Sequence, residues 1–207
     1  MLLIQKKLVE LLHTKKYYSN YYNRSITKYR DINAYITLFD RLSKKSCPIT
    51  TDKKINHTAC INFGCTLNSV KRDLHASFSI VKAQKFCSIL FYKMKIGTYK
   101  IVVELHFFKN KLVFFKYLFP SLRNQREIEK QLRNKYLEKN RLIDFDSQYI
   151  IDPYNNYIKI DNEVCFSIYY ISPNFGFFEY LSQRRKILKK DIKLKKQLTH
   201  TELIDKL

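Results

Sequence analysis

The sequence predicts an α+β protein in which helices pack against a central antiparallel sheet of about five to seven strands. Apolar residues recur at helical spacing near the N-terminus, alternate from about residue 78, and return to helical spacing after Pro173. The 45% hydrophobic fraction is sufficient for a core, and three glycines and four prolines are too few for a disordered or linker-rich chain. No resemblance to a known family supports this prediction.

The N-terminal region has the pattern of two helices. Residues 2–12 place apolar side chains at helical spacing between charged ones, which indicates a short amphipathic helix. Ser25 is a suitable N-cap for a second helix, which must end before Pro48 because the residue preceding a proline resists the α region. We therefore expect a helical hairpin over residues 1–46 and a connection over residues 47–58.

The middle of the chain changes from helical to alternating spacing. Residues 60–63 read as a strand, Gly64 as a tight turn and Thr66 as the cap of a short helix. The segment VVELHFFKNKLVFFKYLFP, residues 102–120, then alternates bulky apolar side chains on both sides of the break at Lys109–Asn110. This pattern predicts a β-hairpin at the centre of the sheet, covered by helices on at least one face.

The remaining elements follow from turn and capping residues. Ser121 is a potential cap for a helix that ends near residue 140, and residues 148–160 predict a second hairpin. Residues 163–172 predict one more strand. The sheet domain is accordingly expected over residues 59–172, followed by a basic C-terminal helix over residues 173–207.

The chain carries a large positive charge. Lys and Arg number 39 against 18 Asp and Glu, which gives a formal net charge of +21. Such a surface attracts anions such as nucleic acid or acidic lipid. The alternative explanation is coding bias. Of the basic residues, 29 are Lys and only 10 are Arg, and Asn, Ile, Tyr and Phe are also abundant. Lys and these four residue types have A/T-rich codons, so the base composition of the genome can account for much of the lysine. An even spread of lysines would favour bias, whereas a single stripe would favour selection for an anion.

The strongest concentration of charge is RRKILKKDIKLKK, residues 184–196, with a net charge of +7. On a helix these basic side chains are spread around the polar side, and Leu188 and Ile192 lie on the other side. Such a helix can bind along a phosphate backbone or an anionic membrane surface, or its charged face can simply be solvated. The candidate anion-binding residues are Arg184, Arg185, Lys186, Lys189, Lys190, Lys193, Lys195 and Lys196. A second candidate is the tyrosine-rich and lysine-rich segment 15–24, whose rings either stack on bases or cap the core.

Two sets of titratable residues are candidates for catalysis. Glu104 and His106 lie two residues apart on one face of a predicted strand, where a carboxylate can orient an imidazole. A catalytic role requires them to be within hydrogen-bonding distance in a cleft. Asp144, Asp146, Asp152 and Asp161 fit either a metal-dependent nuclease or ordinary turns. A chain with three glycines cannot form a glycine-rich phosphate loop, and a serine-hydrolase elbow is also missing from the sequence.

Cysteine and histidine residues offer one candidate metal site. His57, Cys60, Cys65 and His75 have suitable donor atoms but irregular spacing, so chance proximity explains them better and we expect no metal or other cofactor. Five cysteines scattered over the chain favour reduced thiols in a cytoplasmic protein over a disulfide framework. No segment is apolar enough for a signal peptide or a membrane span.

These observations favour a non-enzymatic binding or interaction module that contacts an anionic partner such as nucleic acid through its basic C-terminal helix. Two alternatives remain open. One is a structural module, homo-oligomeric or bound to a protein partner, whose basicity reflects coding bias. The other is a cryptic metal-dependent nuclease that uses Glu104, His106 and some of the aspartates.

Overall fold

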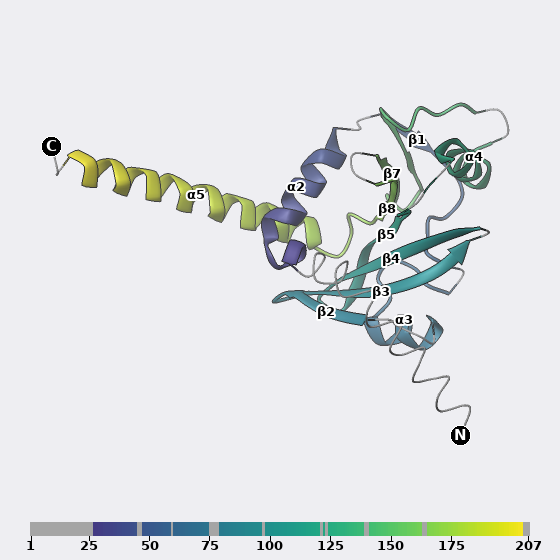
Figure 1. Cartoon of the computed structure of the whole chain (residues 1–207), viewed down its shortest axis with the longest axis horizontal. Coiled ribbons are helices and arrows are strands. Elements are labelled where there is room, and N and C mark those ends of the chain that lie inside the picture. The colour runs from purple at the N-terminus through teal and green to yellow at the C-terminus, as the bar shows by residue number, and fades with distance from the viewer. Residues whose placement is uncertain are drawn as a thin grey trace, which may run out of the picture.

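The computed structural model describes residues 27–204 apart from short gaps at 45–46, 59, 75–78, 97, 121, 123, 139–140 and 163–164. The fold is α+β, built on a single eight-stranded sheet of order β1-β6-β7-β8-β5-β4-β3-β2 (Figure 1). The strands are β1 Cys47–Thr50, β2 Ser79–Gln84, β3 Cys87–Ile96, β4 Tyr99–Phe108, β5 Lys111–Leu118, β6 Gln148–Ile151, β7 Tyr157–Asp161 and β8 Ser167–Ile171. The named helices are α2 Ile32–Ser43, α3 Leu67–Leu74, α4 Gln125–Tyr136 and α5 Phe177–Ile204.

Strand β1 corrects the predicted strand number and the predicted connection over residues 47–58. The described residues form eight strands rather than five to seven, and β1 pairs with β6 in parallel whereas every other pair is antiparallel. Pro48 concealed this strand because proline cannot donate to a ladder of hydrogen bonds. It is tolerated because β1 lies at the edge of the sheet.

The predicted β4–β5 hairpin is confirmed. Lys109 and Asn110 both have positive φ, at 47° and 64°, as a two-residue type I′ turn requires. Between Leu112 and Phe114 the register shifts, which leaves Val113 as an extra residue opposite β4. Alternation on β5 is therefore interrupted, and Val113 and Phe114 both join the core on the same face of the sheet.

Helices cover both faces of the sheet. One core contains Val70 of α3 and Leu132 and Tyr136 of α4 together with one set of alternating strand residues. The opposite core contains Leu38 and Leu42 of α2 together with the first turns of α5. The sheet is thus buried on both sides, as the aromatic residues on both faces of the central hairpin predicted.

The shorter predictions have mixed outcomes. Gly64 has φ +84°, and the Thr66 Oγ1 accepts a hydrogen bond from the Ser69 N–H at 3.2 Å, so both the turn and the helix cap are confirmed. Residues 60–63 form a loop rather than a strand. Helix α4 is capped by Asn124. Ser121, which was predicted as this cap, and the predicted helix over residues 2–12 lie outside the described residues. The division into segments 1–46, 59–172 and 173–207 stays a prediction.

The C-terminal helix projects from the body. Helix α5 begins at Phe177, four residues after Pro173, and extends away from the sheet beyond α2 (Figure 1). None of the described helices has both the length and the apolarity needed to cross a membrane.

Candidate functional site

Helix α5 has two parts with different environments. Phe177 and Leu181 are buried in the core beneath α2, which fixes the first turns of the helix to the body. From Ser182 to Lys193 every side chain is exposed except the half-buried Leu188. The second part therefore offers its surface to solvent while the first part holds it in place.

Most of the positive charge on the exposed part of α5 lies on one side of the helix. At 3.6 residues per turn, five basic side chains fall within an arc of about 140°. We name this set, Arg185, Lys186, Lys189, Lys190 and Lys193, the basic arc. Arg184, Ile187 and Leu188 lie on the other side, and Ile192 borders the arc next to Arg185. Five of the six basic side chains between Ser182 and Lys193 therefore form one stripe along the helix. Lys195 and Lys196 belong to α5 as well, but their side chains lie outside the described part of the chain.

The root of the basic arc is fixed to α2 by an ion pair. Arg185 donates from both terminal nitrogens to the two carboxylate oxygens of Asp40, at 2.9 and 2.8 Å. A bidentate pair fixes the orientation of the guanidinium group as well as its position. Both partners are about half exposed, so its contribution to stability is that of a surface pair, about 0.2–1 kcal/mol.

Arg184 is directed elsewhere. Its guanidinium carbon lies 5.7 Å from the centre of the Tyr180 ring, and its Nε donates to the Tyr180 hydroxyl at 3.4 Å. Arg184 was predicted as an anion-binding residue together with the basic arc. In the structure it lies apart from that arc, next to an aromatic ring.

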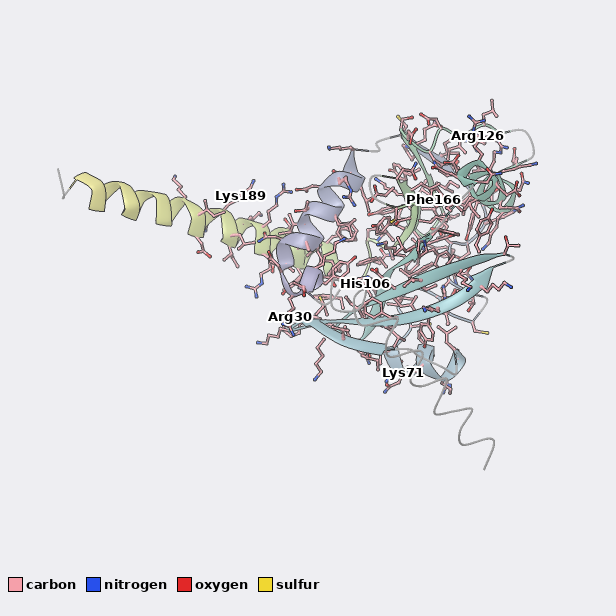
Figure 2. All side chains as sticks on the ribbon, viewed as in Figure 1. Arg30, Lys71, His106, Arg126, Phe166 and Lys189 are labelled. Carbon is pink, nitrogen blue, oxygen red and sulfur yellow. The ribbon has the colours of Figure 1, made fainter. Side chains whose placement is uncertain are left out.

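Glu104 and His106 are close together but deeply buried. The His106 Nε2 lies 3.2 Å from the Glu104 Oε2, yet the two residues are only 2% and 1% exposed and lie beneath α2. Figure 2 shows His106 between the sheet and that helix, whereas Lys189 extends from α5 into solvent. The catalytic hypothesis required a cleft, and this burial leaves a substrate no access to either residue.

Two tyrosines complete the hydrogen bonds of this pair. The Tyr29 hydroxyl donates to the Glu104 Oε2 at 3.1 Å, and the Tyr35 hydroxyl lies 3.2 Å from the His106 Nδ1. Because a carboxylate only accepts hydrogen bonds, the His106 Nε2 carries the proton and the Nδ1 accepts from Tyr35. Burial lowers the pKa of His106 to about 4, against the opposing effect of Glu104, so the imidazole is neutral at pH 7.

Polar side chains continue across the sheet beneath α2. Glu104, Lys116, Tyr169 and Lys159 stand directly opposite one another on four neighbouring strands. The Lys116 Nζ lies 3.6 Å from the Glu104 Oε1. Burial alone would lower the pKa of Lys116, but the charge of Glu104 and the Tyr169 hydroxyl outweigh it and raise this pKa, so the ammonium group stays charged.

The same row attaches α2 to the sheet. The Lys159 Nζ donates to the Leu42 carbonyl oxygen at 2.7 Å, near the end of α2. The Arg41 guanidinium lies 2.6 Å from the Asp161 carboxylate. These contacts explain the buried polar residues as a structural network between helix and sheet.

Of the four candidate zinc ligands, His57 has another partner. The His57 Nδ1 lies 2.7 Å from the Tyr117 hydroxyl, and burial lowers the pKa of His57 to about 4. Cys60 is exposed and Cys65 is half-buried, while His75 lies outside the described residues. Within the part of the chain that the structure describes, no three such side chains are grouped closely enough to hold a metal ion.

The four aspartates have separate roles. Asp152 accepts hydrogen bonds from the backbone of Ile55, Tyr154 and Asn156, as a residue that organises turns does. Asp161 pairs with Arg41 as described above. Asp144 binds the backbone N–H of Asp146 within its own turn, at 3.0 Å.

Asp144 and Asp146 also line a cavity of about 460 Å³ between α4 and the segment 143–146. Arg126 and Glu129 of α4 face the same space. The cavity therefore contains both signs of charge and favours no particular ligand.

Sequence patterns identified the basic stripe but missed the residues that position it. Asp40 lies 145 residues from Arg185, and Tyr29 and Tyr35 lie more than 70 residues from the polar pair they cover. The only sequence signal for any of these three residues was the helical spacing that places Tyr29 on the inner face of its helix. Comparison with protein-family models, curated proteins and solved structures gives no match, so the candidate site rests on its own geometry.

Proposed function

We propose that this protein is a non-enzymatic binding module that contacts nucleic acid through the basic arc of α5. The observation that carries the proposal is the arrangement of five cationic side chains along one side of an exposed, anchored helix. Among the described side chains from Ser182 to Lys193 there is one acid, Asp191, so phosphate would meet little competing negative charge on this helix.

The chemistry of the arc favours backbone contact over sequence reading. Four of its five residues are lysines, which act on phosphate as point charges, whereas base edges are read best by the planar fork of arginine. Each phosphate that is neutralised releases condensed counterions, so the affinity would fall steeply as salt rises. The proposed activity is therefore nucleic-acid binding with little sequence preference.

The first test neutralises the arc without unfolding the protein. Replacing four arc lysines by glutamine is expected to abolish detectable binding to a labelled oligonucleotide at low salt, measured by fluorescence anisotropy. The replaced residues are Lys186, Lys189, Lys190 and Lys193.

The matched control changes four exposed lysines of the body to glutamine and has the same net charge. These residues are Lys53, Lys95, Lys100 and Lys130. The control is expected to keep most of the wild-type affinity. Equal loss in the two variants would show that bulk charge, rather than the arc, attracts the oligonucleotide.

The ion pair at the root of the arc gives a test in the opposite direction. In the Asp40→Asn variant Arg185 loses its carboxylate partner and becomes free to bind phosphate, so the affinity for the oligonucleotide is expected to rise severalfold. Glu179→Gln is the control, because it also removes one exposed acid near the start of α5. An equal rise in both variants would mean that Arg185 takes no part in binding.

A further inference from the structure

An exposed aromatic ring lies where two hairpin turns meet the start of α5. The Lys109 N–H donates to the Phe86 carbonyl oxygen at 2.9 Å, which joins the β4–β5 turn to the β2–β3 turn. Phe86 stands at this junction with 41% of its surface exposed. In Figure 1 this end of β2 and β3 lies on the side of the body from which α5 projects.

Two further rings hold Phe86 in position. Its ring centre lies 6.3 Å from that of Phe108 and 6.2 Å from that of Tyr180, both in edge-to-face geometry. Phe108 and Tyr180 are themselves 5.1 Å apart, and Phe108 is fully buried. We name these three rings the aromatic platform. Contact with the buried Phe108 and the half-buried Tyr180 restricts the motion of Phe86, which lowers the entropy lost when a ligand stacks on it.

Cationic groups surround the platform. The Lys85 and Lys109 ammonium groups lie 5.4 and 5.9 Å from the centre of the Phe86 ring. Arg184 lies over Tyr180 and precedes the basic arc by a single residue. Tyr180 and Arg184 lie on the side of α5 opposite the basic arc, so a strand that contacts both the platform and the arc must pass around the helix.

An exposed ring among cations is suited to a ligand that combines a flat apolar surface with negative charge. A nucleotide has both, as a base and a phosphate, and stacking on an aromatic side chain tolerates any base. In a duplex the bases are already stacked on one another, so only an unpaired base can reach the ring. An acidic peptide would use the cations but not the exposed face of Phe86.

We propose that Phe86 stacks on an unpaired base of a single-stranded nucleic acid whose backbone passes around α5 from the platform to the basic arc. This inference rests on the proposed function and defines its substrate class as single-stranded. The Phe86→Leu variant keeps an apolar side chain but removes the ring. It is expected to weaken binding to a labelled single strand about fivefold or more and to leave the dependence on salt unchanged.

The matched control is Ile80→Ala, which shortens another exposed apolar side chain, 39% exposed, on neighbouring strand β2. Its single-strand affinity is expected to equal that of the wild type, and the affinity of both variants for a blunt duplex should not change. Equal single-strand affinities for the Phe86→Leu and Ile80→Ala variants would overturn the inference.

A spectroscopic measurement separates stacking from simple proximity. The chain contains no tryptophan, so Phe86→Trp introduces a single tryptophan at the platform, whose emission can be excited separately from that of the tyrosines. Its emission is expected to be quenched when single-stranded DNA binds, whereas the emission of Ile80→Trp should change little. Binding of the strand by anisotropy without quenching would overturn the stacking inference and leave the proposed function standing. Absence of any binding by the wild-type protein at low salt would overturn both.

Discussion

Replacing Glu104 by glutamine is expected to lower the free energy of unfolding by about 3–5 kcal/mol. The substitution leaves the ammonium group of Lys116 buried without its carboxylate, because these two groups lie 3.6 Å apart and both side chains are almost inaccessible. A buried charge without a partner is among the most destabilising changes that a point mutation makes. Urea unfolding at pH 7, followed by circular dichroism, measures the loss.

The matched variant removes both charges. Glu104→Gln combined with Lys116→Met removes both members of the ion pair, so neither charge is left buried without the other, and keeps side chains of similar length. This double variant is expected to recover most of the stability lost by the single one. A single variant within about 1 kcal/mol of the wild type would contradict the assignment of this pair as a structural ion pair.

Acid is expected to weaken the fold through two buried histidines. Burial is the main cause that lowers the pKa of both His57 and His106 to about 4, below the usual value of 6.5. The unfolded chain therefore binds more protons than the folded chain between pH 6.5 and pH 4, and stability falls as the pH falls through this window. The loss is on the order of 3 kcal/mol for each histidine at the lower end.

Variants that cannot be protonated at these positions isolate this effect. In His57→Gln and His106→Gln the decrease in unfolding free energy between pH 7 and pH 4.5 is expected to be smaller than in the wild type. His200, in the part of α5 whose side chains are not described, is replaced by glutamine as the comparison. A pH profile that neither buried-site variant changes would show that both imidazoles titrate normally.

Local sequence patterns predicted the elements whose stability depends on neighbouring residues. Alternation and an Asn in the turn were sufficient for the β4–β5 hairpin, since register and turn geometry act over a few residues. Helix α2 was predicted as a helix, and its buried residues are Tyr35, Leu38 and Leu42. Tyr35 can be fully buried there because His106, distant in sequence, accepts a hydrogen bond from its hydroxyl group.

Contacts between distant segments were beyond the reach of such patterns. The parallel pairing of β1 with β6 joins residues about 100 positions apart, and Pro48 argued against any strand there. In the candidate site, the stripe of basic residues follows from helical spacing alone. The ion pair that anchors it and the platform of Phe86, Phe108 and Tyr180 come from segments that only the fold brings together.

If the basic arc of α5 contacts the phosphates of nucleic acid as proposed, removing its lysines must change how binding responds to salt. The most direct measurement is the affinity for a labelled single strand at several salt concentrations, for the wild type and for the variants with four lysines replaced in the arc or in the body. We expect a log–log slope of about −2.8 for the wild type, from the four arc lysines at about 0.7 per phosphate, because Arg185 is paired with Asp40. The body variant should keep this slope, and the arc variant should show no detectable binding even at the lowest salt concentration. Binding by all three proteins with the same slope would contradict the proposal.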